Sequence, residues 1–414
     1  MRTGINTEIA LTYLLSRKKQ TGVAALGVTF GISMYIFMNS LIAGTNDYFE
    51  KVTLSTTPHV RLYSDNKMSN ASLLQTYLQD GTIKIISNPK LTASDNRIKD
   101  PFKLIHSLKT DREVMALSAQ VSSNVIYTYS GVDRNGTVYG VNILEQDKMF
   151  DITSTLLTGK TDDLQNTPDG IIIGAGLASD LNVTKGNYIT LTASNGMAKR
   201  LRVVGIFKTT IKAIDNTKTY VNVPVAEQLL KKDRSYITEI YINIKDYTQA
   251  PQFARKAEQL TGYQAEDWQG ANEQSVAARK IRDVIANSVV VTILIVAGFG
   301  IYNILNMTIY EKIKEIAILK ATGFAGTHVI SIFIRQAMFI GLIGSFMGLA
   351  LGWTLALLVS KLYIGMGNVS YLPMAFKIPH YIQGFVFGVI TTFFAGYIPA
   401  VKASKVDPVQ IIRG

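Results

Sequence analysis

Residues 21–46 read TGVAALGVTFGISMYIFMNSLIAGTN and contain no charged side chain. An uncharged run of this length exceeds the roughly 20 residues that an α-helix needs to cross the hydrocarbon core of a membrane. The run follows Arg17, Lys18 and Lys19, as the apolar part of a signal peptide would, but that part has only about 7–15 residues. We therefore interpret residues 21–46 as a retained first transmembrane helix.

Three further uncharged runs occupy residues 284–310, 336–360 and 381–401, and each is also long enough to cross a membrane as a helix. The predicted fold class is an α+β membrane protein with four transmembrane helices and a large α+β extracytoplasmic (periplasmic) domain inserted between helices 1 and 2. The segments between the helices are predicted as a cytoplasmic amphipathic segment (1–20), the extracytoplasmic domain with its stalk (47–283), a cytoplasmic coupling helix and loop (311–335), an outer loop (361–380) and a cytoplasmic tail (402–414).

The distribution of charge predicts the orientation. The net charge is +12, but residues 47–283 are close to neutral, with 29 Lys/Arg and 26 Asp/Glu. Residues 1–20, 311–335 and 402–414 together hold 11 Lys/Arg and 4 Asp/Glu. Basic residues beside transmembrane helices mark the cytoplasmic side. We therefore expect both termini in the cytoplasm and no nucleic-acid partner.

A basic triplet lies on the opposite side, just ahead of the second transmembrane helix. Its members are Arg279, Lys280 and Arg282. We expect this triplet to contact anionic lipid head groups or the anchored end of a substrate, since basic groups are attracted to anionic membrane surfaces. A solvated face of the stalk helix is the alternative.

The sequence contains no motif of a known catalytic or metal-binding site. Cysteine does not occur, and the four histidines, at positions 59, 106, 328 and 380, are scattered without the spacing of metal ligands. Gly159, Lys160 and Thr161 imitate the end of a phosphate-binding loop, but Ser154 occupies the position of the glycine that the motif requires. We predict no catalytic residue, no metal and no cofactor, so that the energy for any transport comes from a partner.

Glycines recur at every fourth position in two of the predicted transmembrane helices. Gly344, Gly348 and Gly352 do so in the third helix, and Gly27 and Gly31 in the first. Small residues at this spacing let two helix backbones approach closely in a membrane. The pattern predicts helix packing at these five glycines, either within one subunit or between subunits.

The segment 47–283 is predicted to be mixed α+β. Alternating or β-branched runs indicate strands at residues 59–64, 122–129, 137–143, 170–174, 188–193, 200–207, 219–225 and 239–244. Helical patterns cover residues 71–79, 101–108, 226–232 and 250–262. Residues 270–283 continue without a breaker into the second transmembrane helix, so one long stalk helix is expected.

Residues 310–323, YEKIKEIAILKATG, form a short cytoplasmic element with helical periodicity. Ile313, Ile316, Ala317 and Lys320 share one stripe of this predicted helix. Two interpretations of the stripe remain open, a contact with a partner protein and packing on the neighbouring transmembrane helices. Residues 276–319 contain no proline, which predicts a nearly continuous lever from the stalk into this element.

The sequence resembles a known family. The stretch 310–323 resembles the signature that follows the second helix of FtsX-like permeases, the MacB and Lol group of ABC transporters. YIPA at 397–400 with ASKVDPV at 403–409 is similar to the closing motif of that family, and ALTYLLSRK at 10–18 to its entry motif. IIG at 172–174, VVGIF at 203–207 and Asp267-Trp268 are also similar, so the resemblance spans essentially the whole chain.

This resemblance implies partners and sites. It implies two ABC ATPase subunits, a second permease subunit in a homodimer or heterodimer, membrane lipid, and a periplasmic carrier or adaptor. The residues expected to couple to the ATPase are Glu311, Lys312, Glu315, Ile316, Leu319 and Lys320. The first and second helices of two such subunits are expected to line a central cavity.

The expected function is extraction of lipoproteins from the inner membrane for release to a carrier. No fused ATPase domain is present, Tyr371-Leu372-Pro373 occurs in the last outer loop, and Asp267-Trp268 precedes the basic stalk. The turn at residues 193–198 is shorter than the protruding loop of the carrier-catching Lol subunit. A MacB-like exporter of envelope substrates and an FtsX-like regulator of cell-wall hydrolases remain as alternatives.

Overall fold

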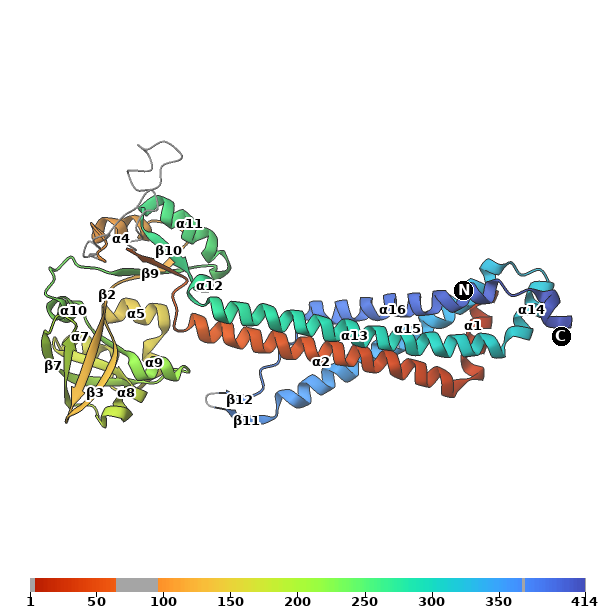
Figure 1. Cartoon of the computed structure of the whole chain (residues 1–414), viewed down its shortest axis with the longest axis horizontal. Coiled ribbons are helices and arrows are strands. Elements are labelled where there is room, and N and C mark those ends of the chain that lie inside the picture. Colours follow the sequence, from red (N-terminus) through yellow and green to blue (C-terminus); the bar gives the residue numbers. More distant parts are fainter. Residues whose placement is uncertain (1–3, 65–95, 367–368, 414) are drawn as a thin grey trace, which may run out of the picture. The chain divides into compact units, whose positions relative to one another are not determined.

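The computed structural model describes residues 4–64, 96–366 and 369–413, so the helix predicted at residues 71–79 lies outside the described residues. The chain divides into two compact units, both drawn in Figure 1. The helical unit comprises residues 1–50 and 274–414, and the inserted domain comprises residues 51–273. Each unit is described by itself.

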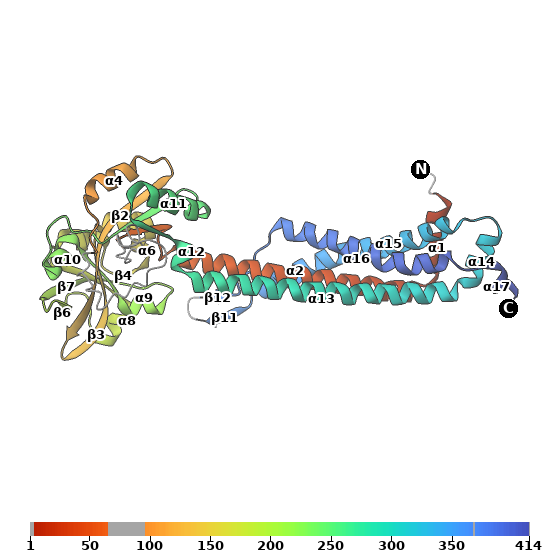
Figure 2. The same cartoon turned by 45° about the horizontal axis from the view of Figure 1, so that its top comes forward.

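The helical unit is built around four long helices that run side by side in Figures 1 and 2. They are α2 (Lys18–Leu54), α13 (Glu273–Glu311), α15 (Gly326–Ser360) and α16 (Ile378–Ser404). All four are long and apolar enough to cross a membrane. Even α16, with 27 residues, reaches about 40 Å at 1.5 Å per residue, against a hydrocarbon core of about 30 Å.

Shorter elements complete this unit. They are α1 (Ile5–Ser16), α14 (Ile313–Ala321), α17 (Pro408–Arg413) and the hairpin of β11 (Tyr363–Met366) with β12 (Val369–Tyr371). Both termini lie near α14 in Figure 1, at the end where α13 and α16 finish. We call this the terminal end of the helical unit, and the other end of the four helices the far end.

Glycines set how closely α15 lies on α2. A Cβ atom added at Gly344, Gly348 or Gly352 would lie only 2.7–2.8 Å from the Cβ atoms of Val28, Ile32 and Ile36, respectively. Such a distance is too short for two carbon atoms, so the glycines are what permits this approach.

The two predicted packing glycines of α2 differ from those of α15. A Cβ atom at Gly31 would lie 3.3 Å from the Cβ of Ala297 on α13, whereas one at Gly27 would meet no atom within 4 Å. Close helix packing within the subunit is therefore found at the three glycines of α15 and is looser at Gly31. At Gly27 no atom of the described part of the subunit lies within 4 Å of such a Cβ atom, so helix packing there stays a prediction for a contact between subunits.

The inserted domain is a mixed sheet with helices packed on it. Among the described residues the strand order is β10-β1-β9-β2-β3-β8-β5-β7-β4, and β6 pairs with both β2 and β7. The pairs β3–β8 and β5–β7 are parallel and the other pairs are antiparallel. The strands are β1 (Val60–Tyr63), β2 (Val114–Tyr129), β3 (Val132–Val141), β4 (Leu156–Thr158), β5 (Gly170–Gly174), β6 (Tyr188–Ala193), β7 (Ala198–Phe207), β8 (Lys218–Asn222), β9 (Glu239–Ile244) and β10 (Gln264–Asp267).

The helices of this domain are short. They are α4 (Pro101–Lys109), α5 (Ile143–Phe150), α6 (Ile152–Thr155), α7 (Thr161–Asn166), α8 (Ala175–Leu181), α9 (Lys212–Thr217), α10 (Val223–Leu230), α11 (Ala250–Thr261) and α12 (Trp268–Ala271). Apolar clusters lie on both faces of the sheet, as strand β5 shows. Alternate residues of a strand point to opposite faces. Ile171 and Ile173 belong to one buried apolar cluster and Ile172 to a second one.

The fold class predicted from the sequence is confirmed: a membrane protein with four apolar helices and a large α+β domain between the first and the second. Among the local predictions that are wrong, two concern the end of a strand and the lever. The strand expected at residues 219–225 ends at Asn222, because α10 begins at Val223 with Pro224 in its first turn, a position that suits proline. The nearly continuous lever is interrupted at Lys312, whose φ of −98° and ψ of 9° separate α13 from α14.

Candidate functional site

A cavity of about 630 Å³ lies at the far end of the helical unit, among α2, α13 and α16. It is lined by Tyr35, Asn39, Ile42, Ala43, Asn46, Asp47, Arg279, Asp283, Ala286, Asn287, Val290, Val291, Leu294, Lys377, His380, Gln383 and Phe387. These positions come from three helices far apart in the sequence, so no local motif reveals the cavity.

Charged and amide side chains form the outer part of this cavity. Arg279 on α13 pairs with Glu50 on α2 at 2.5 Å, and Lys377 pairs with Asp47 at 2.8 Å. The amide nitrogen of Asn46 donates to the carboxylate of Asp283 at 2.9 Å. These contacts tie α2 to α13 and to the start of α16 by polar groups, and leave a charged rim.

The part of the cavity nearer the membrane interior is largely apolar. Val290 and Leu294 of α13 belong to, or pack against, the apolar cluster that also contains Tyr35. Phe387 of α16 meets the Tyr35 ring edge-on, with centroids 5.9 Å apart. The cavity therefore combines a charged mouth with an apolar interior, which is the distribution that an amphipathic ligand requires.

The basic triplet does not act as one unit in the structure. The guanidinium of Arg282 donates to Asn46 at 3.0 Å and lies over the ring of Phe49 at 5.3 Å. Arg279 is paired with Glu50, as described above. Lys280 is exposed. Two of the three residues therefore join α13 to α2, and only Lys280 presents its charge away from this contact.

The predicted coupling helix is α14, at the terminal end. Ile316 and Ala317 are 1% and 0% exposed. Ile316 belongs to the apolar cluster that also contains Tyr13 of α1, Phe333 of α15 and Ala403 of α16. The apolar stripe thus packs on neighbouring helices of its own subunit, and the interpretation of Ile316 as an ATPase contact is not supported by its position.

The charged residues predicted for coupling have partners within the subunit. Arg17 forms an ion pair with Glu311, which is the last residue of α13 rather than part of α14. Lys312 pairs with Glu315 at 2.5 Å. Lys320 donates to the carbonyl oxygens of Ser404 and Val406 at 2.9 and 2.6 Å. Leu319 is half-buried.

Tyr13 of α1 is held by the same contacts. The ammonium of Lys312 lies 5.3 Å from the centre of its ring. Burial, and then the nearby carboxylate of Glu315, raise the pKa of Tyr13 to about 12. The phenol therefore stays neutral and available as a hydrogen-bond donor to Glu315 at every physiological pH.

The exposed face of α14 contains two residues that the sequence analysis did not select, Lys314 and Ile318. Ile318 is 56% exposed. Residues four positions apart share a helix face, so Lys314 and Ile318 lie together, about half a turn around the helix from the buried Ile316. This spacing was visible in the sequence, but the direction in which each face points was not.

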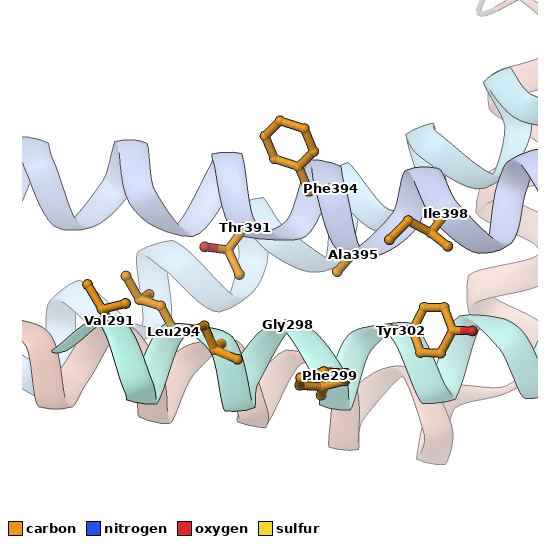
Figure 3. Close-up of a pocket in the computed structure, with 10 residues that line it drawn as sticks. Val291, Leu294, Gly298, Phe299, Tyr302, Thr391, Phe394, Ala395 and Ile398 are labelled. Atoms are coloured by element: carbon orange, nitrogen blue, oxygen red, sulfur yellow. The ribbon is translucent and has the colours of Figure 1, made fainter. Parts of the chain in front are cut away.

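A second hollow, an apolar groove of about 680 Å³, runs between α13 and α16. In Figure 3 the labelled side chains of Val291, Leu294, Phe299 and Tyr302 come from α13, and those of Thr391, Phe394, Ala395 and Ile398 from α16. Ile295 and Gly298 complete its lining. The hydroxyl oxygen of Tyr302 accepts a hydrogen bond from Lys402 at 3.1 Å.

Four membrane-spanning helices and an α+β domain inserted after the first of them define a multi-pass membrane protein. Among the described residues, no group of His, Asp and Glu side chains could hold a metal ion. The chain belongs to the FtsX-like permease family of ABC transporters: the model of the FtsX-like permease C-terminal family matches residues 287–408, and that of the MacB-like periplasmic core domain matches residues 21–260.

Two relatives align over nearly the whole chain. The lipoprotein-releasing system transmembrane protein LolC of Neisseria meningitidis serogroup B is 23% identical, and the match covers 98% of both chains. The uncharacterized ABC transporter permease YknZ of Bacillus subtilis is 22% identical, covering 99% of this chain and 98% of the relative. The pyoverdine export ATP-binding/permease protein PvdT of Pseudomonas syringae pv. syringae is 30% identical over 44% of this chain and 27% of its own.

Solved structures resemble parts of the chain. The periplasmic region of MacB from Actinobacillus actinomycetemcomitans matches at 12% identity and a TM-score of 0.35, covering 54% of this chain and 94% of that one. The extracellular domain of YknZ from Gram-positive bacteria matches at 16% identity and a TM-score of 0.31, with 40% and 88% covered.

Proposed function

We propose that this chain is the permease subunit of an ABC transporter that extracts lipoproteins from the inner membrane and releases them to a carrier. The observation that carries the proposal is the alignment with LolC over 98% of both chains. In this proposal the chain itself hydrolyses no ATP, two separate ATPase subunits supply the energy, and a second permease subunit, identical or different, completes the complex. Both termini face the cytoplasm.

The cavity at the far end gives the proposal a physical basis. Burying an acyl chain is worth about 0.8 kcal/mol per methylene group, so removing one 16-carbon chain from a bilayer into water costs on the order of 12 kcal/mol. Transfer into a cavity with an apolar interior avoids most of that cost. The charged mouth, with Arg279, Lys377 and Asp47, suits the polar end of a lipid-anchored protein.

The coupling element in this proposal is the exposed face of α14, with Lys314, Glu315 and Ile318 as the residues that meet the ATPase. Because the chain bends at Lys312, movement of α14 would reach α13 through side-chain contacts as well as through the backbone. The Arg17–Glu311 pair and the Lys312–Tyr13 contact join α1, α13 and α14 at this bend. Of the basic triplet, Lys280 is proposed to meet lipid head groups, while Arg279 lies at the mouth of the cavity.

The test reconstitutes the chain with its ATPase in vesicles that contain a fluorescent triacylated lipoprotein, and measures ATP-dependent release into solution with a soluble carrier present. The same protein without its acyl chains serves as the substrate control. We expect release, and stimulation of ATP hydrolysis, only with the acylated form. Equal stimulation by the unacylated protein would contradict lipoprotein extraction.

Variants connect this assay to the cavity. Ala43 lines the cavity and Leu41, on the same helix, does not. Ala43→Phe narrows the cavity and is expected to lower release at least tenfold, whereas Leu41→Phe should leave release near the parental value. If both variants released lipoprotein at the parental rate, the cavity would not be the path of the acyl chains.

A MacB-like exporter of envelope substrates is the second candidate. Two observations favour it. The MacB-like periplasmic core domain matches residues 21–260, and the turn between β6, which ends at Ala193, and β7, which begins at Ala198, is short. In that case transport would require a periplasmic adaptor instead of a carrier, and unacylated substrates would stimulate ATP hydrolysis. The acylation control above separates the two candidates.

A further inference from the structure

The groove between α13 and α16 is open to one side of the helical unit, and nothing in the described part of the subunit fills it. The two helices approach each other at Gly298 and Thr391, because a Cβ atom added at Gly298 would lie 3.2 Å from Cγ2 of Thr391. Beside this contact the side chains of Val291, Ile295 and Phe299 are 54–63% exposed. An apolar hollow of this kind on a membrane helix pair is filled by lipid or by another protein.

The length of the groove matches one leaflet of a bilayer. Its α13 lining runs from Val291 to Tyr302, about three turns or 16 Å along the helix axis. The hydrocarbon core is about 30 Å thick, so one leaflet contributes about half of this depth. The groove thus has the extent of a single acyl chain held along α13 and α16.

The ammonium group of Lys402 lies at one end of the groove, the end nearer the terminal end of the helical unit. Lys402 follows Ile398 by four residues on α16, and so lies on the same helix face one turn further on. Its ammonium donates to Tyr302, which itself lines the groove. Within the described residues no carboxylate pairs with Lys402; its neighbours are the phenols of Tyr302 and Tyr310. The charge is therefore free to meet an anion.

We propose that this groove binds one anionic phospholipid, with an acyl chain along α13 and α16 and the phosphate at Lys402 and Tyr302. The apolar lining matches the acyl chain of such a lipid, and the cation matches its phosphate. A basic group near anionic lipid favours binding by about 1 kcal/mol. The groove adjoins the cavity at the far end, since Val291 and Leu294 line both, but the proposed lipid site does not depend on the proposed transport function.

The experiment places the full chain in phosphatidylcholine vesicles with a trace of photoactivatable phosphatidylglycerol, or of photoactivatable phosphatidylcholine, and maps the labelled peptides by mass spectrometry. We expect phosphatidylglycerol to label the peptides of α13 and α16 that line the groove, and phosphatidylcholine to label them less. Lys402→Gln should lower labelling by phosphatidylglycerol about fivefold, the factor that corresponds to about 1 kcal/mol. Lys405→Gln, which removes an exposed charge three residues on, should not.

A groove-filling variant tests the apolar half. Thr391→Trp should reduce labelling by both lipids, and Val296→Trp, on an exposed α13 position outside the groove, should not. Equal labelling by the two lipids in the parental protein would overturn the proposal in favour of unselective bilayer lipid. If neither lipid labelled the groove and the Phe299→Cys variant formed a disulfide between two chains, the proposal would be overturned in favour of a second copy of the chain.

Discussion

Lys320 shows at the residue scale how one side chain joins two parts of the helical unit. Its ammonium donates to two carbonyl oxygens, at Ser404 and Val406, where α16 ends. The last carbonyl groups of a helix lack partners within the helix and carry partial negative charge. The cation therefore both satisfies these groups and fixes α14 against the segment that follows α16.

Replacing this lysine should loosen that junction. Lys320→Met removes two hydrogen bonds from a charged donor, and we expect it to lower stability by about 2 kcal/mol. Thermal unfolding in detergent and protease cleavage near residue 405 measure the effect. Lys314→Met, an exposed change on the same helix, is the control and should stay within about 0.5 kcal/mol of the parent. Equal effects of the two variants would contradict the role of Lys320.

The environment of His59 predicts that the stability of the inserted domain depends on pH. Burial lowers its pKa from 6.5, and the hydrogen bond with Ile244 opposes this only in part. The unfolded chain therefore binds a proton more readily than the folded one, so folding is favoured less as the pH falls. The contribution is fully present above about pH 6.5, the unfolded value, and is lost progressively below it as the pH approaches the folded pKa.

We expect urea unfolding of residues 51–273 to show lower stability at pH 5 than at pH 7.5, and His59→Gln to reduce this difference. His106→Gln, at an exposed position on α4, is the matched control and should preserve it. An unchanged pH dependence in the His59 variant would show that other groups cause it.

At the scale of elements, α14 has two faces with different roles. Ile316, which belongs to an apolar cluster with residues of α1, α15 and α16, holds it inside the subunit, while Lys314 and Ile318 are exposed. Charge reversal at Glu311 would also break its ion pair with Arg17. A loss of transport in that variant could then come either from a lost ATPase contact or from a disturbed subunit structure. The exposed apolar residue, Ile318, offers the cleaner probe.

Ile318→Asp is expected to weaken copurification of the ATPase and to lower coupled transport, while thermal stability changes by no more than about 0.5 kcal/mol. Ile316→Asp, the matched change on the buried face, places an unpaired carboxylate in an apolar cluster and should cost several kcal/mol. Copurification and thermal unfolding are measured on both. If Ile318→Asp assembled and transported like the parent, this face of α14 would not be the coupling surface.

The packing of α15 on α2 is a second property of elements. A Cβ at Gly348 would lie 2.8 Å from that of Ile32, so Gly348→Ala should force the helices apart at a cost of about 1–3 kcal/mol. Gly27→Ala meets nothing within 4 Å and should be neutral or gain up to about 1 kcal/mol from helix propensity. Thermal unfolding in detergent compares the pair. Similar losses in both would mean that Gly27 packs against something beyond this subunit.

Sequence patterns predicted some of these elements well. The strands at residues 170–174, 188–193 and 239–244 have the bounds that were predicted, because apolar or alternating runs end there at turn residues. The first half of β2, from Val114 to Val121, was missed because Ala, Ser and Gln interrupt its pattern. Periodicity also showed which residues of α14 share a face, but only tertiary packing decides which face is buried.

For the whole molecule, the number and order of the long helices could be predicted because an uncharged run of 20 or more residues has few other uses. The cavity at the far end could not, because its lining joins α2, α13 and α16 across more than 300 positions of sequence. The same holds for the groove beside Lys402. Sites between helices depend on rotation of each helix about its axis, which composition alone does not determine.

Orientation is a testable property at this scale. Because the native chain has no cysteine, single cysteines can report it. Ser194→Cys should react with an impermeant thiol reagent in intact spheroplasts, and Thr322→Cys, in the turn after α14, should react only after lysis. The reverse pattern of labelling would refute cytoplasmic termini.

The first and last strands of the inserted domain are neighbours: β1 pairs with β10, and Val60 lies opposite Asp267. A domain whose entry and exit lie together can be inserted into another protein with little disturbance of its host. A gene could therefore exchange the whole segment for a homologous one by recombination and keep its membrane helices intact. Selection could then diversify what is recognised outside the membrane while the apparatus within it stays the same.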